Sequence, residues 1–424
     1  MEKLIIEGGK PLVGTARIHG AKNAALPILA AAIMARGVHV IENVPRLLDI
    51  DVMLSILTAL GCRAERQEDR IVLDTTRLVT SHIPKELMTQ MRSSIFLMGP
   101  LLARMGSVQV YQPGGCAIGT RRIDLHLKGL EALGAVIDES EGRIVCTADR
   151  LVGTEIMLDF PSVGATENIM MAAVTAQGTT VIQGAAREPE IVDLQNMLNA
   201  MGARISGAGT DVITIHGVDE LSACRYRIIP DRIVAGTLMI AVAASGGEIT
   251  LTDVNSRHLT AIIHVLRRAG VQISVSDDIM KVAARGRPKA VDRIVTAPYP
   301  AFPTDLQAQM MVLLALADGT SILKETIFEG RFKHIGELIR MGADIRQDLN
   351  SAFIRGVPRL YGTTVEATDL RAGAAVVIAG LCAKGITIVE QIHHIDRGYE
   401  RIEQLFASLG ADIRRLSPAP VRPT

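Results

Sequence analysis

The sequence predicts an α/β fold assembled from six copies of one supersecondary unit, and three repeated features support this prediction. A short phrase ending in glycine closes an amphipathic stretch six times, at intervals of 68 to 73 residues. Once in each interval a second glycine opens a β-favouring run, and a stretch that is apolar nearly all round also recurs. A period this regular over a whole chain indicates one structural unit copied six times. The first set of glycines is Gly61, Gly134, Gly202, Gly270, Gly342 and Gly410, and the second is Gly37, Gly106, Gly178, Gly246, Gly319 and Gly385.

Each unit is expected to contain two helices of different character. The helix that ends at the first glycine is amphipathic, as Leu194, Met197 and Leu198 illustrate by recurring on one face. Such a helix covers a sheet and shows its other face to water, whereas a helix that is apolar all round is buried. We therefore expect an inner layer of helices, sheets around it, and outer helices that cover part of the sheets. The buried helices are expected to begin near Lys22, Arg92, Gly164, Arg232, Asp305 and Arg371.

The sixth unit is short, because little sequence follows Ile413. The N-terminus has the missing piece, since residues 11–18 (PLVGTARI) resemble residues 150–157 (RLVGTEIM) and both segments precede a buried helix. Residues 1–21 are therefore expected to pair into the C-terminal half of the chain.

This pairing predicts two domains of three units each, linked by two strands that form a natural hinge. The expected domains are 22–229 and 230–424 plus 1–21, and the linking strands lie near 20–22 and 227–231.

The composition excludes several classes of protein. The 424 residues carry a formal net charge of zero, which removes the electrostatic signature of a general nucleic-acid or membrane-surface binder. A ring of six units around nucleic acid is disfavoured too, because its inner helices would be basic rather than apolar. No apolar stretch reaches the roughly 20 residues of a membrane span, and the start of the chain has no signal-peptide core. Five cysteines without a CxxC pair fit a reducing cytosol and argue against a zinc site or a disulfide framework. We expect a globular cytoplasmic protein without a metal or other cofactor.

Polar residues gather where the buried helices are expected to begin. Capping alone explains five of them, because Ser, Thr and Asp are common N-caps. It does not explain Lys22, Arg92 and Arg371, since a cation at a helix N-terminus opposes the macrodipole. An anion bound between them would account for the pattern, because helix N-termini and guanidinium groups both bind phosphate and carboxylate. An ion-paired or solvent-exposed cation remains the alternative for each one. The five cap candidates are Ser162, Asp231, Thr304, Asp305 and Asp369.

Two glycine-containing loops add further candidates. In residues 113–124, Cys116 lies among glycines, and Arg121 and Arg122 would lower the pKa of its thiol. The other four cysteines are interpreted as buried small hydrophobic residues. In residues 393–400, a histidine pair precedes Arg397, a further candidate anion ligand. A metal site at this pair is disfavoured, because adjacent side chains diverge on a strand.

Seven segments taken together resemble the UDP-N-acetylglucosamine enolpyruvyl transferases, and the similarity extends over the whole chain. The resemblance implies a two-domain inside-out α/β barrel of six βαβαββ repeats, three per domain, with the active site in the interdomain cleft. It implies transfer of the enolpyruvyl group of phosphoenolpyruvate to the 3'-hydroxyl of UDP-N-acetylglucosamine with release of phosphate, the first committed step of peptidoglycan synthesis. The segments are 20–27, 113–119, 162–166, 186–193, 302–309, 367–373 and 394–400.

The resemblance also implies roles for individual residues. Asp305 matches the proposed base for the acceptor hydroxyl, although a helix N-cap remains its alternative interpretation. Cys116 matches a lid-loop cysteine that acts as general acid or in product release and that fosfomycin alkylates, and Lys22 and Arg397 match further catalytic residues. The phosphoenolpyruvate ligands would be Lys22, Asn23, Arg92, Arg121, Arg331, Arg371 and Arg397. The UDP-sugar contacts would be Asn23, Arg92, Arg121, Arg122, Ile123, Asp124, Leu125, Ser162, Val163, Gly164, Asp305 and Ile327.

The chain departs from this family at three positions. Phe160 replaces a lysine found near the nucleotide in some members, Arg122 stands where many have proline, and Gly330 stands where asparagine is usual. The alternative function is that of the sister enzyme, which transfers enolpyruvate to shikimate 3-phosphate and lacks the ProGlyGlyCys lid. Neither activity is expected to need a metal, since arginine side chains supply the positive charge.

Overall fold

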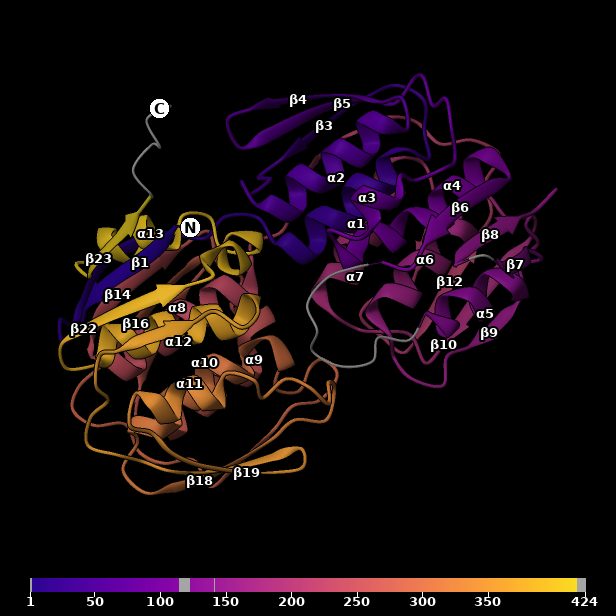
Figure 1. Ribbon diagram of the computed structural model, residues 1–424. Coiled ribbons are helices and arrows are strands. Elements are labelled where there is room, and N and C mark those ends of the chain that lie inside the picture. Colours follow the sequence, from indigo (N-terminus) through magenta and orange to yellow (C-terminus); the bar gives the residue numbers. More distant parts are fainter. Residues whose placement is uncertain (1, 114–122, 141, 418–424) are drawn as a thin grey trace. The chain divides into compact units, whose positions relative to one another are not determined.

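The computed structural model of the protein describes residues 2–113, 123–140 and 142–417. These residues form two compact units (Figure 1). The N-terminal unit consists of the described residues of His19–Ile229. The C-terminal unit consists of those of Met1–Ile18 and Pro230–Thr424.

The third repeat shows the βαβαββ order in full. Its elements are β9 (Glu155–Met157), α6 (Val163–Ala173), β10 (Thr179–Gln183), α7 (Pro189–Ala200), β11 (Arg204–Ser206) and β12 (Val212–His216). β9 and β10 are parallel because the apolar helix α6 connects them, whereas β12 pairs antiparallel with both β10 and β11. The resulting sheet has the strand order β11-β12-β10-β9.

The other repeats of the N-terminal unit follow the same order. In the second repeat the strand before the apolar helix is reduced to one parallel bridge between His82 and Gln109, so its sheet has three strands in the described residues. The elements are α1 (Lys22–Ala32), β3 (Val38–Glu42), α2 (Leu48–Ala59), β4 (Arg63–Gln67), β5 (Arg70–Asp74), α3 (Lys85–Met88), the 3-10 helix η1 (Arg92–Leu97), α4 (Met98–Met105), β6 (Ser107–Tyr111), α5 (Asp124–Ala132), β7 (Val136–Ser140), β8 (Arg143–Thr147) and β13 (Arg225–Arg227).

The C-terminal unit repeats the order three more times. Its elements are β1 (Lys3–Glu7), β2 (Leu12–Arg17), α8 (Arg232–Ser245), β14 (Gly247–Thr252), η2 (Ser256–Leu259), α9 (Thr260–Arg268), β15 (Gln272–Ser276), β16 (Ile279–Ala284), β17 (Arg293–Val295), η3 (Thr304–Leu306), α10 (Gln307–Leu316), β18 (Thr320–Lys324), α11 (Ile335–Arg340), β19 (Asp344–Asp348), β20 (Ser351–Arg355), β21 (Thr364–Glu366), α12 (Leu370–Cys382), β22 (Ile386–Glu390), η4 (Ile392–Arg397), α13 (Ile402–Ser408) and β23 (Asp412–Leu416).

The N-terminus completes the sixth repeat, which confirms the pairing that the short final unit predicted. β1 lies antiparallel between β22 and β23, with Leu4 opposite Val389 on one side and Arg415 on the other. Two further strands are exchanged between repeats. β2 precedes α1 but pairs with β14, and β13 precedes α8 but pairs with β3. Each exchanged strand comes directly before the point where the chain passes from one unit to the other.

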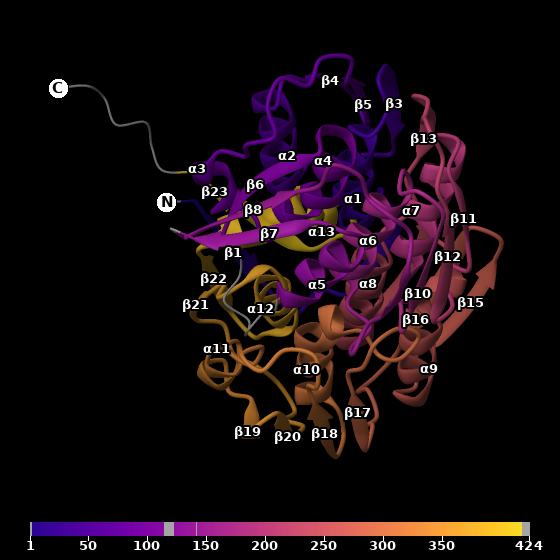
Figure 2. The ribbon, with the colours of Figure 1, turned by 90° about the vertical axis from the view of Figure 1, so that its right-hand side faces the viewer.

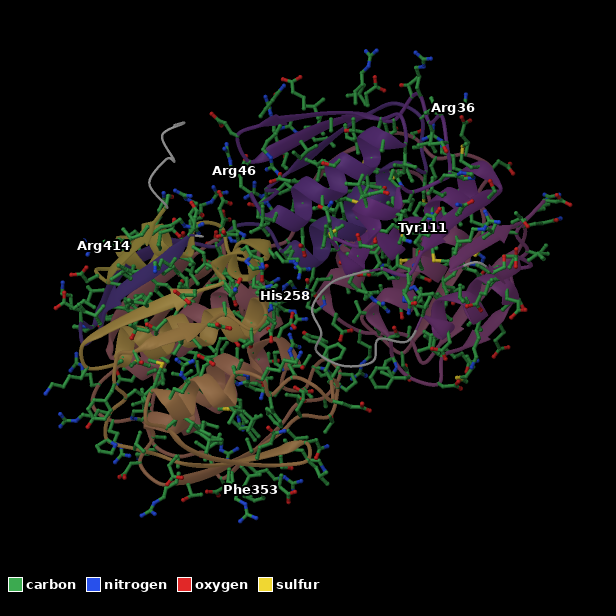
Figure 3. All side chains as sticks on the ribbon, in the orientation of Figure 1. Arg36, Arg46, Tyr111, His258, Phe353 and Arg414 are labelled. Atoms are coloured by element: carbon green, nitrogen blue, oxygen red, sulfur yellow. The ribbon has the colours of Figure 1, made fainter. Side chains whose placement is uncertain are left out.

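The core of each unit is formed by the apolar helices. α8, α10 and α12 pack side by side in the C-terminal unit (Figures 1 and 2), and α4 packs on α6 in the N-terminal unit. Every α12 residue from Leu370 to Leu381 is buried. Each sheet buries one face, as Ile249 and Leu251 on β14 show. The opposite face meets solvent, since Phe353 on β20 is 40% exposed (Figure 3). Among the described residues no helix is long and apolar enough to span a membrane.

Two of the amphipathic helices differ in position from the sequence-based expectation. α7 packs beside the apolar helix α1 and α5 beside α6, whereas α13 packs over the strands β23 and β2 as expected. Their apolar faces are buried as expected, with Leu194, Met197 and Leu198 fully covered. The six glycines that follow these helices all have φ between 89° and 108°. Glycine adopts this conformation without strain, so it ends each helix and turns the chain into the next strand.

The packing of α4 on α6 yields a stability prediction. A Cβ on Gly99 would lie 2.3 Å from the carbonyl oxygen of Asn168, so the two helices approach at a point that only glycine permits. Gly99→Ala is therefore expected to destabilise the protein by about 1–3 kcal/mol through overpacking, despite the higher helix propensity of alanine. Gly336→Ala in α11 is the control, since a Cβ there meets nothing within 4 Å; it should stabilise by up to about 1 kcal/mol. Chemical denaturation of both variants checks this, and equal effects would contradict the close approach.

Candidate active site

Three of the polar residues at the helix starts are N-caps, as the sequence predicted. The Asp231 carboxylate accepts the backbone N–H groups of Ile233 and Val234 at 2.8 and 3.0 Å. Asp369 accepts those of Arg371 and Ala372 at the same distances, and Ser162 caps α6. These side chains satisfy backbone donors that have no partner within the helix.

Thr304 and Asp305 are not caps, which corrects the capping interpretation. They begin the 3-10 turn η3, which has no side-chain cap bond. Their side chains instead contact residues that are distant in the sequence, Glu325, Arg331 and Arg371. A helix start therefore carries polar residues here because they bind partners from the loop after β18 and from the first turn of α12.

Asp305 lies between two buried guanidinium groups. Its Oδ1 is 2.6 Å from Arg331 and its Oδ2 is 2.9 Å from Arg371, and the two arginine side chains are 5% and 4% exposed. Burial by itself raises the pKa of the Asp305 carboxyl, but the charges and hydrogen bonds of Arg371 and Arg331 outweigh it and hold this pKa well below its usual range. The carboxylate is therefore ionised and is stabilised by two positive charges.

Further buried groups hold Arg371 and Asp305 in place. The Arg371 guanidinium lies over the Tyr399 ring, 5.6 Å from its centroid. Gln309 donates to the Tyr399 hydroxyl, to the Thr237 hydroxyl and to the backbone carbonyl of Asp305, at 3.1 to 3.2 Å. Burial lowers the pKa of Arg371, but Asp305, Tyr399 and Asp231 together outweigh it, so this pKa is raised and the side chain stays charged.

Sequence reasoning missed Glu325, which connects the Arg331 loop to the Asp305 turn. This buried residue directly follows β18, and its carboxylate accepts hydrogen bonds from the Thr304 hydroxyl and from the backbone of Ile327. Ile327, a candidate UDP-sugar contact, is thereby tied to the same cluster as Arg331. The only sequence signal was a single glutamate at the end of an apolar strand.

Arg397 ends η4, which packs against α12 and therefore lies in the same region as Arg371. Arg415 on β23 holds this turn through a bidentate ion pair with Asp396, at 2.5 and 2.9 Å. Its neighbour Arg414 points to solvent (Figure 3). The histidine pair lies on η4 rather than on a strand, and its two rings stack with centroids 4.1 Å apart. The expectation that the side chains of His393 and His394 diverge is therefore wrong, because it assumed that both residues lie on a strand.

In the N-terminal unit, Lys22 begins α1 and is paired with a carboxylate that sequence reasoning missed. Its Nζ lies 2.6 Å from Oδ2 of Asp49 in α2, and the two side chains are 9% and 4% exposed. This pair explains how a cation is held at a helix N-terminus. Asn23 follows directly in α1. The signal for Asp49 was a polar residue at a buried position in the first turn of an amphipathic helix.

The remaining described candidates of this unit lie around His126 of α5. Burial, together with the Arg92 charge, lowers the pKa of His126 to about 4, although Asp124 raises it in part. A Cβ on Gly164 would lie 3.0 Å from this ring. Asn168 accepts the Gly99 N–H, so its amide nitrogen donates to His126 Nδ1 at 2.8 Å and fixes the neutral ring. The other candidates lie next to these residues at the starts of α5 and α6; they are Ile123, Leu125, Ser162 and Val163.

Three candidates, Cys116, Arg121 and Arg122, lie outside the described residues. Cys62 and Cys146 are buried as the sequence predicted, whereas Cys224 and Cys382 are only partly buried. Burial raises the thiol pKa of all four. This pKa is about 11 for Cys62 and about 12 for Cys146 and Cys382, and it is raised for Cys224.

Two of the positions where the chain departs from the family are described. Phe160, which precedes α6, is 45% exposed, and Gly330 lies in the turn before Arg331. In the described part of the chain, no group of three or more His, Cys, Asp or Glu residues is arranged to hold a metal ion.

These geometries define the chemistry that the site can perform. Buried arginines with one shared carboxylate form a site for an anion such as phosphate. The carboxylate itself is ionised and is therefore in the correct form to accept a proton. Both functions meet at the start of α10, where Asp305 and Arg331 touch.

Comparison with known proteins identifies relatives over nearly the full chain. The family described as EPSP synthase (3-phosphoshikimate 1-carboxyvinyltransferase) matches residues 6–406. UDP-N-acetylglucosamine 1-carboxyvinyltransferase 2 of Caldanaerobacter subterraneus subsp. tengcongensis and that of Carboxydothermus hydrogenoformans are each 55% identical, over 98% of this chain and all of theirs. The UDP-N-acetylglucosamine 1-carboxyvinyltransferase of Desulforapulum autotrophicum is 50% identical over the same shares.

Solved structures show the same fold. The enolpyruvyl transferase NikO from Streptomyces tendae aligns with a TM-score of 0.89 at 26% identity, covering 98% of this chain and 99% of its own. EPSP synthase from Acinetobacter baumannii aligns with a TM-score of 0.75 at 17% identity, over 98% and 100% of the two chains. The chain therefore has the two-domain α/β fold of these enzymes and belongs to the EPSP synthase family, within the UDP-N-acetylglucosamine 1-carboxyvinyltransferases.

Proposed function

We propose that this protein transfers the enolpyruvyl group of phosphoenolpyruvate to the 3'-hydroxyl of UDP-N-acetylglucosamine and releases phosphate. The observation that carries the proposal is the ionised Asp305 between the buried Arg331 and Arg371. The arrangement offers positive charge for an anionic donor and a carboxylate for the acceptor hydroxyl. The 50–55% identity to UDP-N-acetylglucosamine 1-carboxyvinyltransferases supports the choice of acceptor. Both substrates are cytoplasmic metabolites, so we place the reaction in the cytoplasm as a step of peptidoglycan synthesis.

Each charged group has a role in this reaction. A proton adds to C3 of phosphoenolpyruvate while the acceptor hydroxyl loses its proton to Asp305 and its oxygen bonds to C2, which gives a tetrahedral adduct. The adduct then loses a proton from C3 as the bond between C2 and the phosphate oxygen breaks, so the enol double bond is restored and phosphate is released. Arg331 and Arg371 neutralise the phosphate and carboxylate of the donor, together with Lys22, Arg92 and Arg397, and with Arg121 from outside the described residues. The site needs a supporting partner for each buried cation before substrate arrives. Asp305 provides it in the C-terminal unit, and Asp49 provides it for Lys22 in the N-terminal unit.

Asp305 consequently competes with the donor for the two arginines. A carboxylate held by two guanidinium groups is a weak base, because both charges favour its ionised form. When the anionic donor takes over part of the arginine hydrogen bonding, Asp305 regains basicity at the moment when a base is required. The ion pair thereby links the binding of the donor to the activation of the acceptor.

The sister activity with shikimate 3-phosphate is the second candidate. The match to the EPSP synthase family favours it in part, but the compared EPSP synthases are only 17–18% identical to this chain. The deciding experiment measures phosphate release from phosphoenolpyruvate with each acceptor in turn. We expect release only with UDP-N-acetylglucosamine, and release only with shikimate 3-phosphate would reverse the proposal.

Asp305→Asn is expected to lower kcat by roughly 100-fold or more, because an amide accepts no proton, while UDP-sugar binding stays within about tenfold. The unfolding free energy should fall by about 1–3 kcal/mol, since two buried guanidinium groups lose their charged acceptor. Inorganic phosphate should bind this variant about tenfold tighter than the wild type, because its competitor is gone. Calorimetric phosphate titration and steady-state kinetics measure these effects.

The control is Asp292→Asn, which changes an exposed aspartate of the same unit and should leave all three quantities unchanged.

The pH dependence of stability provides a second check. Because the folded-state pKa of Asp305 lies below the unfolded value of about 3.9, the stability from this ion pair is complete above that pH and is lost only as pH falls through the folded-state pKa. The stability difference between Asp305→Asn and wild type should therefore be constant from pH 5 to 8. A kcat above about a tenth of the wild-type value would show that the base lies elsewhere.

Cys116 is expected to be the cysteine that fosfomycin alkylates, and alkylation should be faster with UDP-N-acetylglucosamine present. The reason is that burial raises the thiol pKa of each of the other four cysteines, which keeps them in the unreactive thiol form. Peptide mapping by mass spectrometry locates the adduct. A first adduct on Cys62, Cys146, Cys224 or Cys382 would contradict the assignment.

A further inference from the structure

Glu325 is a buried carboxylate to which neither the sequence motifs nor the reaction assigns a role. It is 2% exposed and directly follows β18. Its two oxygens accept four hydrogen bonds, at 2.7 to 3.2 Å, from three separate segments. A charged side chain this well satisfied is held in one orientation, and it holds its donors in turn.

One oxygen, Oε1, organises the loop that follows β18. It accepts the backbone N–H groups of Ile327 at 2.7 Å and Phe328 at 3.2 Å, and the hydroxyl of Thr296 at 2.8 Å. The Thr296 hydroxyl also accepts the N–H of Thr326 at 2.9 Å. The backbone around Ile327 is therefore fixed by Glu325 rather than by a helix or strand.

The other oxygen, Oε2, acts on Asp305 through two intermediates. The Thr304 hydroxyl donates its single hydrogen to Oε2 at 2.8 Å, so its oxygen is free to accept the N–H of Arg331, also at 2.8 Å. Arg331 then uses its second terminal nitrogen to hold Asp305 at 2.6 Å. The direction of each hydrogen bond along this chain depends on Glu325 having an oxygen, and no hydrogen, at Oε2.

We propose that Glu325 is a positioning residue for the transfer reaction: Oε1 fixes the Ile327 backbone, and Oε2 fixes the orientation of Arg331 and Asp305 through Thr304. This inference rests on the proposed function, in which Asp305 is the base and Ile327 contacts the UDP-sugar. The two oxygens therefore control different kinetic constants. Loss of the Oε2 branch lowers kcat, and loss of the Oε1 branch raises KM for the UDP-sugar.

Glu325→Gln separates the branches with almost no change of shape. The amide oxygen takes the Oε1 position, because the N–H groups of Ile327 and Phe328 require an acceptor, so the amide NH2 group faces Thr304. The Thr304 hydroxyl must then accept from the amide, so its hydrogen loses its acceptor. The hydroxyl has to turn to find another acceptor, which misaligns the lone pair that faces Arg331. We expect kcat to fall by roughly 10- to 100-fold, the effect of one lost charge-assisted hydrogen bond. KM for the UDP-sugar should stay within about threefold.

Thr304→Val removes the hydroxyl that links Glu325 to Arg331 and should reproduce this loss of kcat. In the double variant the two losses should not add, because both substitutions break the same chain of hydrogen bonds. Glu325→Ala removes both branches, so it should lower kcat and also raise KM. Glu329→Gln, at an exposed position of the same loop, is the matched control and should leave both constants unchanged.

Hydrogen exchange gives a readout that does not require activity. The amides of Ile327 and Phe328 should remain protected in Glu325→Gln and exchange at least tenfold faster in Glu325→Ala. Additive kcat losses in the double variant, or a loss of thermal stability with unchanged kcat and KM, would overturn the proposal and leave Glu325 a purely structural residue. If the wild type releases no phosphate with UDP-N-acetylglucosamine, the proposed function fails instead, and the exchange data still test the two branches.

Discussion

Six helices without a polar face set the main constraint on this structure. A helix such as α12, buried from Leu370 to Leu381, is stable only when other elements enclose it on every side. Sheets and amphipathic helices provide that enclosure along its length, but they leave the helix starts for loops to cover. Polar groups are tolerated there because backbone N–H groups at the helix starts need acceptors. The candidate site is thus built at the one part of each core helix where the fold admits charge.

The charges at these helix starts are satisfied in pairs before any substrate arrives. Burying a guanidinium or ammonium group without a partner is costly, so Asp305 serves Arg331 and Arg371 while Asp49 serves Lys22. An incoming anion takes the place of a carboxylate that already holds the cations in position. The same exchange changes the basicity of the displaced carboxylate, which gives Asp305 both a structural and a chemical role.

The sequence was most informative where local chemistry decides the structure. The recurring apolar stretches located the six apolar helices of the described residues, although Arg92 begins the 3-10 turn η1 and α4 follows only at Met98. Ser162, Asp231 and Asp369 cap their helices through backbone groups two or three residues away. Prediction failed where the partner is distant. Asp305 looked like a cap because Arg331 and Arg371 are 26 and 66 residues further along the chain. Glu325 and Asp49 were missed for the same reason. The position of α5 and α7 beside the apolar helices depended on contacts that periodicity does not contain.

The placement of β1 has a consequence for biosynthesis. Its partners β22 and β23 are the last strands of the described residues, so Leu4 pairs with Val389 and Arg415, which lie 385 and 411 positions later. At 5–20 residues per second, translation takes roughly 20 to 80 s between these segments. The described residues of His19–Ile229 form their own compact unit and can fold during this interval, while the strand β1 (KLIIE) stays unpaired. The charges of Lys3 and Glu7 at its two ends are of the kind that discourages pairing with other nascent chains. β1 is therefore translated before every other described strand and is among the last to find its sheet.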